Sequence, residues 1–128
     1  MRTREIPAVE WTAFLQQFSA EHRAWLASVD RVRPGASRHV EVVERPLGSV
    51  TASVAARRVV GIQIQFQEDS NAGGAIRIER PKRLRVEETE EGAVRALEIE
   101  DESGQSTRVG FRVTARPEAL DGIAPGEL

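Results

Sequence analysis

Cysteine is absent from the 128 residues of this chain, which excludes disulfides, zinc–thiolate sites, iron–sulfur clusters and cysteine nucleophiles. Tyrosine is absent too, and Lys82 is the only lysine among 18 basic residues. No apolar run approaches the roughly 18 residues of a membrane-spanning helix. The charged start Met1–Glu5 is not followed by the apolar stretch of about 7–15 residues found in secretory signals. We therefore expect a cytoplasmic protein with no membrane partner.

Size and charge are those of one ordinary domain. Charged residues make up 30% of the chain and hydrophobic residues 40%, which is typical of globular proteins. The formal net charge of −2 provides no overall attraction to nucleic acid or anionic lipid. We expect a single α+β domain over residues 1–116, followed by a loosely ordered, Pro/Gly-bearing C-terminal tail over residues 117–128.

The first apolar residues recur at helical spacing, from about Pro7 to His22. Pro7 suits the first turn of a helix, where its missing N–H costs nothing. Positions i, i+3, i+4, i+7 and i+11 share one face of such a helix. The residues at these positions are Trp11, Phe14, Leu15, Phe18 and His22. The pattern predicts one helix with a single apolar face.

After the helix the apolar residues alternate, which is typical of half-buried antiparallel strands. Turn signals such as Pro34-Gly35 and Glu90-Glu91-Gly92 separate the alternating runs. We expect about six strands, around residues 25–32, 39–45, 60–66, 76–86 with an interruption at Pro81, 97–100 and 108–113. Residues 49–58 are rich in small side chains, and their pattern supports no assignment.

One helix is too narrow to cover such a sheet. Six strands at about 4.8 Å spacing span nearly 30 Å, whereas a helix with its side chains is about 10 Å across. Two outcomes follow, and they are compatible. Either the sheet curls strongly into a half-barrel or barrel-like form, which is the favoured outcome, or its uncovered part packs against a second copy as a homo-oligomer.

His22 and Trp25 are the first candidates for a ligand site. A histidine on the apolar face of a helix can serve as a base or a metal ligand, but a structural hydrogen bond from its ring to a backbone carbonyl is the simpler interpretation. His39 begins a strand with nothing nearby to complete a site. Two histidines without an organised carboxylate set do not form a metal signature. We expect no catalytic residue, no metal and no cofactor.

Arginines form the second group of candidates. The segment Arg80–Arg85, together with Arg77, Arg108 and Arg112, suggests a cationic strip on the outer face of the sheet. Within it, Arg83, Arg85, Arg108 and Arg112 are the candidate ligand or partner residues. Nucleic acid is disfavoured as a partner, because glutamates interleave with these arginines and the aromatic residues that would stack on bases fall on inward positions. The acidic pairs, such as Glu87-Glu88, are expected in solvated turns.

Two segments of the chain resemble a family of small uncharacterised bacterial proteins, a domain of unknown function. The first is the N-terminal series Glu5-Ile6-Pro7, Trp11, Phe14-Leu15, Phe18-Ser19, His22 and Trp25. The second is the series Leu97-Glu98-Ile99, Asp101, Gly104 and Thr107. The resemblance implies a bacterial, single-domain, cytoplasmic protein and assigns no catalytic or binding residue.

Three hypotheses of function remain. The first is a non-catalytic domain that self-associates or binds a protein partner, because the apolar face of the sheet exceeds what one helix covers. The second is nucleic-acid binding through the arginine-rich face of the sheet. The third is a small-molecule pocket near His22 and Trp25.

Overall fold

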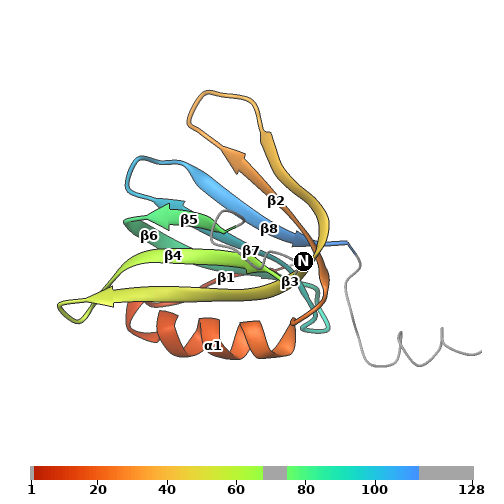
Figure 1. Cartoon of the computed structure of the whole chain (residues 1–128), viewed down its shortest axis with the longest axis horizontal. Helices are drawn as coiled ribbons and strands as arrows, with labels where there is room; N and C mark the ends of the chain where they lie inside the picture. The colour runs from red at the N-terminus through yellow and green to blue at the C-terminus, as the bar shows by residue number, and fades with distance from the viewer. Residues whose placement is uncertain (1, 68–74, 113–128) are drawn as a thin grey trace, which may run out of the picture.

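The computed structural model describes residues 2–67 and 75–112, which form one helix and one antiparallel sheet (Figure 1). The elements, in chain order, are β1 Arg2–Glu5, the 3₁₀ turn η1 Ala8–Glu10, α1 Trp11–Glu21, β2 Leu26–Val32, β3 His39–Ala55, β4 Arg58–Phe66, β5 Ile76–Glu79, β6 Pro81–Glu88, β7 Val94–Asp101 and β8 Ser106–Phe111. The predicted α+β class, with one N-terminal helix on an antiparallel sheet, is confirmed.

The eight strands lie in the order β1-β6-β7-β8-β2-β3-β4-β5, so β1 and β5 are the edges. Five pairs join strands that follow one another in the chain: β2–β3, β3–β4, β4–β5, β6–β7 and β7–β8. The remaining two pairs are distant in sequence: β1 joins β6, and β2 joins β8. The N-terminal strand is therefore held in the sheet by a strand far along the chain.

Helix α1 places its apolar face on the sheet as its spacing predicts. Trp11, Leu15 and Phe18 are buried, and Phe14 packs against the same core. The helix begins later than expected: Pro7 precedes the 3₁₀ turn η1, and the α-helix starts at Trp11. The Nε1–H of Trp11 donates to the carbonyl of Ile6 at 2.7 Å, which fixes the entry into the helix.

Strand β3 is unusually long, 17 residues, because it pairs with different neighbours along its length. Residues up to Pro46 pair with β2, and residues from Leu47 onward pair with β4. The register shifts between Leu47 and Ser49, so the strand bends at Pro46–Gly48. The segment 49–58, which had no assignment, is mostly the second half of this strand.

The bend lets two parts of the sheet share one core. Buried side chains from α1 and from every strand except β1 form a single cluster. Arg80, with φ 50°, lies between β5 and β6 and links the two parts of the sheet a second time, away from the bend. Its N–H donates to Val60 O in β4, and its carbonyl accepts from the N–H of Glu102, which follows β7. The inward faces of the strands are thus buried within one chain.

Three expectations about the sheet are wrong. It has eight strands rather than about six, since β1 carries no apolar alternation and β5 and β6 are separate strands. It is not closed or strongly curled into a half-barrel or barrel; a local bend, rather than continuous curvature, brings its apolar faces together. The second strand, expected to end at residue 45, does not end there, because the chain continues through Pro46 and Gly48 into the pairing with β4.

Inward positions are otherwise mostly as the alternation predicts, with Val40 and Val60 as exceptions. Ile62, Ile64 and Phe66 are buried, whereas Val60 is exposed. A register shift between Ser53 and Val54 displaces this end of the β3–β4 pair by one residue. The last residue of the strand expected at 108–113 and the tail expected at 117–128 lie outside the described residues.

Gly48 at the bend has no room for a side chain, so Gly48→Ala is expected to destabilise the fold. A Cβ there would lie 2.9 Å from Gln65 O and 3.3 Å from Gln67 N, which are backbone atoms that cannot move independently. We expect a loss of about 1–3 kcal/mol in the free energy of unfolding, measured by urea denaturation. Gly110→Ala is the control, because its Cβ would meet only the flexible end of Arg108. Equal stability of the two variants would contradict the importance of the bend.

Candidate functional site

His22 lies within a group of aromatic rings at the C-terminal end of α1. Its ring centroid is 4.5 Å from Phe18, 4.3 Å from Trp25 and 5.0 Å from Phe111, and the rings of His22 and Phe111 are nearly parallel at 15°. Trp25 also meets Phe111 edge-on at 5.1 Å. The structure therefore brings the candidates His22 and Trp25 into direct contact.

The neutral ring of His22 is held in one tautomer. Its Nδ1 lies 2.8 Å from the carbonyl oxygen of Phe18, so Nδ1 carries the proton and donates it, as the simpler interpretation predicted. The side chain is 4% exposed. Burial lowers the pKa of His22 below its ordinary value of 6.5, although the hydrogen bond to Phe18 and the charge of Glu21 act in the opposite direction. His22 is therefore neutral at pH 7, with Nε2 as a hydrogen-bond acceptor.

A cleft of about 320 Å³ lies beside His22, between α1, β1, β6 and the β6–β7 turn. Apolar and polar residues both contribute to its lining. The apolar residues include Phe14, Phe18, Val86 and Val94, and the polar ones are Arg4, Gln17, Glu21, His22 and Glu88. Trp25 does not line this cleft, but its ring contacts the ring of His22 edge-on.

Strand β1 brings Arg4 to the cleft. The register places Arg2 opposite Glu88 and Arg4 opposite Val86, and the Ile6 N–H continues the pairing by donating to Leu84 O at 2.8 Å. Nη2 of Arg2 and Nη2 of Arg4 each lie 3.3 Å from a carboxylate oxygen of Glu88. Glu88 is only 8% exposed, and these two guanidinium groups compensate its charge.

Sequence reasoning missed Arg4 and Glu88. The four residues of β1 are all exposed, so the strand has no apolar alternation that would reveal it. Glu87-Glu88 was expected in a solvated turn, which is wrong, because both residues belong to β6 and Glu88 is buried. Only the pairing of β1 with β6 places Arg4 next to Glu88, and the sequence does not indicate that pairing.

The candidate arginines are not brought together into a free cationic strip. Arg85 donates to Glu98 at 2.9 Å and to Glu100 at 3.3 Å, and Arg108 binds Glu87 through two nitrogens, at 2.9 and 3.3 Å. The hydrogen bond from Arg108 lowers the pKa of Glu87, against the opposing effect of burial.

The other two candidates differ in their partners. Arg112 lies 3.6 Å from Glu44, and both side chains are well exposed. Arg83 is exposed and has no side-chain partner in residues 2–67 and 75–112. Three of the four candidate arginines are thus neutralised by glutamates, which weakens the case for a nucleic-acid surface.

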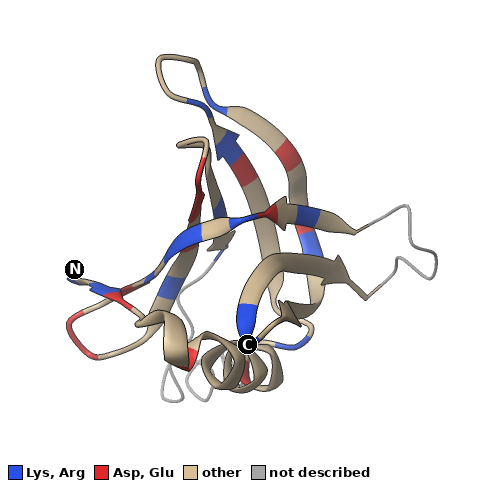
Figure 2. Cartoon of the chain, turned by 90° about the vertical axis from the view of Figure 1, so that its left-hand side faces the viewer, with Lys and Arg blue, Asp and Glu red and all other residues tan. Residues whose placement is uncertain are grey.

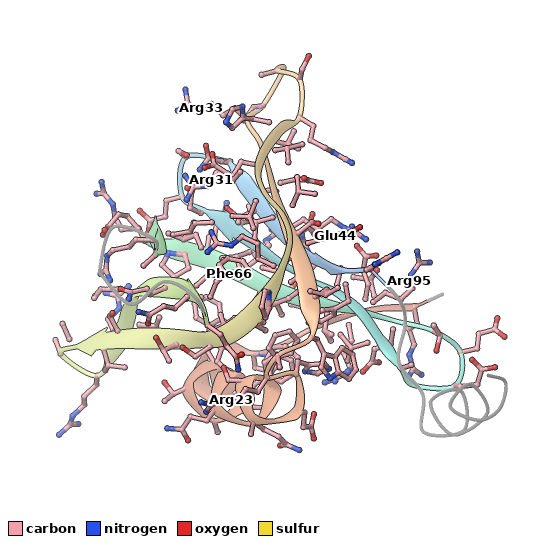
Figure 3. The ribbon with its side chains drawn as sticks, turned by 45° about the vertical axis from the view of Figure 1, so that its right-hand side comes forward. Arg23, Arg31, Arg33, Glu44, Phe66 and Arg95 are labelled. Atoms are coloured by element: carbon pink, nitrogen blue, oxygen red, sulfur yellow. The ribbon has the colours of Figure 1, made fainter. Side chains whose placement is uncertain are left out.

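The β2–β3 hairpin extends beyond the rest of the sheet as an arm (Figure 3, where Arg31, Arg33 and Glu44 are labelled). Its most exposed large apolar residues are Val40 (52%) and Val43 (66%). Within the described chain, no strand pairs with the outer edge of residues 39–45. Two register irregularities and several charged side chains along this hairpin discourage edge pairing.

Comparison with known proteins adds no assignment: no protein family, no curated protein and no solved structure matches this chain. The resemblance to small bacterial proteins of unknown function stays a prediction.

Residues 2–67 and 75–112 also lack two features that would point to a membrane or a metal ion. No helix there is long and apolar enough to cross a membrane. In the same ranges, His, Asp and Glu form no group of three or more that could hold a metal ion.

The neutral state of His22 predicts a dependence of stability on pH. Its pKa is lower in the folded protein than in the unfolded chain, so below about pH 6.5 the unfolded chain binds the additional proton. We expect the urea midpoint to fall between about pH 7.5 and about pH 5.5 in the wild type. His22→Phe, which keeps the ring stacking, should remove most of this fall. His39→Phe is the control at an exposed histidine, and an equal effect of the two substitutions would contradict the assignment.

Proposed function

We propose that the chain is a non-catalytic binding domain that holds a small ligand in the cleft beside His22. The observation that supports this most directly is the composition of the cleft: an apolar aromatic surface next to an unprotonated imidazole nitrogen and a buried carboxylate. Ligand pockets typically combine an apolar lining with a few fixed polar groups in a volume of about 300–1,000 Å³. The cleft has this character at the small end of that range.

The polar groups of the cleft favour a ligand that donates hydrogen bonds. Nδ1 of His22 is used by Phe18 O, which leaves Nε2 to accept. Glu88 already has two guanidinium partners, whereas Glu21 is exposed and accepts from the amide of Gln17 at 3.0 Å. An amine attached to an aromatic ring fits both features, since the ring can pack on Phe14 and the amine can reach a carboxylate or imidazole acceptor.

The same geometry favours binding over catalysis. His22 is oriented by a backbone carbonyl rather than by a carboxylate, and among the described residues no serine or threonine hydroxyl lines the cleft as a nucleophile. Burial and stacking hold the imidazole in place, which suits recognition more than proton transfer.

Tryptamine is a suitable probe for this cleft. We expect it to shift the backbone amide resonances of the cleft residues in ¹H–¹⁵N spectra and to raise the melting temperature of the wild type. Indole-3-acetate, the matched anion, should produce smaller shifts because the exposed carboxylate of Glu21 repels it. His22→Phe should weaken tryptamine binding about tenfold or more, since it removes the acceptor but keeps the ring.

His39→Phe should leave tryptamine binding unchanged, because His39 is exposed on the arm, away from the cleft. Absence of shifts at Phe14, Gln17 and Gly92, or equal binding to the His22→Phe variant, would contradict the proposal.

Self-association stays a second candidate, now located on the arm. Its original motivation is weaker, because one chain buries its own apolar strand faces, but Val40 and Val43 are exposed together on β3. Light scattering on a sizing column decides the matter. If the arm mediates a dimer, Val40→Thr combined with Val43→Thr shifts the mass to that of a monomer; a wild-type monomer at tens of micromolar rejects this candidate.

A further inference from the structure

A larger cleft, of about 500 Å³, lies at the opposite end of α1 from His22. It is bounded by the start of the helix, the β3–β4 turn and the start of β6. Figure 2 views this end of the molecule, with α1 seen end-on below the strands. The charged residues that line the cleft are Arg57, Arg58, Lys82 and Glu102.

The three cations of this cleft lack the partners that most arginines of the sheet have. Arg85 and Arg108 are bound by glutamates on neighbouring strands. Within the described ranges, the side chains of Arg57, Arg58 and Lys82 have no hydrogen bond or ion pair. Three unpaired cations thus accompany one carboxylate, in a chain whose formal net charge is −2.

The turn between β3 and β4 does not itself require an arginine. Ala56 and Arg57 have φ values of 51° and 66°, the left-handed conformation of a two-residue hairpin turn. Asn-Gly adopts this turn with the least strain. Arginine at position 57 of the turn therefore costs conformational free energy. In this position its side chain lines the cleft.

Apolar side chains lie in the same cleft as the cations. Val9 is 94% exposed and Val54 is 54% exposed, and both line it together with Val59 and Pro81. The start of α1 contributes Trp11 and Thr12, and the preceding Glu10 makes no side-chain capping bond.

We infer that this cleft binds a phosphomonoester whose organic part is apolar. Guanidinium groups match the oxygens of a phosphate, and the ammonium of Lys82 adds a further donor. A phosphate dianion compensates more of the three cations than a single carboxylate does. The exposed valines then cover the organic part, and the cleft volume is in the range of small-molecule sites.

Titration with 1-naphthyl phosphate tests this inference, with binding followed by calorimetry and by the amide resonances around Arg57 and Lys82. We expect 1-naphthyl phosphate to bind at least tenfold more tightly than inorganic phosphate, which lacks the ring, or 1-naphthol, which lacks the charge. Affinity should fall as salt is added, because the cations are exposed.

The double variant Arg57→Gln/Arg58→Gln should weaken this binding at least tenfold, and Lys82→Gln should weaken it further. The matched control is Arg23→Gln/Arg33→Gln, which removes the same charge from the end of α1 near His22 and from the arm (Figure 3). Both variants change exposed residues, and their melting temperatures verify that the fold is retained. The control, like His22→Phe, should bind as the wild type does.

Three results would overturn the inference. One is equal affinity in the Arg57/Arg58 variant and its control. Another is binding of 1-naphthyl phosphate no tighter than that of inorganic phosphate or naphthol. The third is tighter binding of a single-stranded oligothymidine, lost in the same variant, which would assign the cleft to nucleic acid instead.

Discussion

The fold depends on β3, which pairs with β2 along its first part and with β4 along its second part. At the bend of β3, Leu47 donates its N–H to Trp25 O at 2.9 Å and accepts from the Ala24 N–H at 2.8 Å. Beyond this point β2 no longer pairs with β3, and α1 contacts β3 instead. The hydroxyl of Ser19 donates to Val50 O at 2.9 Å and accepts from Val50 N at 2.8 Å, so a helix side chain completes pairing that a strand would otherwise supply.

Helix α1 borders both clefts, one toward each of its ends. A helix of 11 residues is about 16 Å long, shorter than a 17-residue strand, so it covers only part of β3. Where the helix ends, loops and neighbouring strands form the remaining walls. Aromatic rings and β1 fill one end beside His22, whereas the other end has unpaired cations and exposed valines. The two clefts therefore differ in the residues that line them.

The sequence shows those features that depend on local periodicity. The helix face, the inward positions of most strands and the contact between His22 and Trp25 all follow from spacing along the chain. Features that depend on strand register could not be predicted. Arg108 meets Glu87 across the intervening strand β7, and β1 is a strand only because β6 offers it an edge.

The bend and the clefts could not be predicted because both depend on which strands pair, and the sequence does not indicate this. Pro46 and Gly48 are stop signals in a local interpretation, and only the pairing of β4 shows that the chain continues. The unpaired state of Arg57 and Arg58 is visible only once the neighbouring carboxylates are placed. Composition alone made these two residues indistinguishable from the arginines that glutamates neutralise.

The position of β2 at the centre of the sheet has a consequence for synthesis on the ribosome. Its hairpin partner β3 follows at once, but its other neighbour, β8, is the last described strand to be made. Until β8 has been synthesised, one edge of β2 is unpaired and its apolar face is uncovered. Strand β1 stays unpaired for about as long, until β6 has been synthesised. Such distant pairings slow folding and leave nascent chains open to mispairing. Overexpression at high temperature should therefore burden chaperones more than the size of the domain suggests.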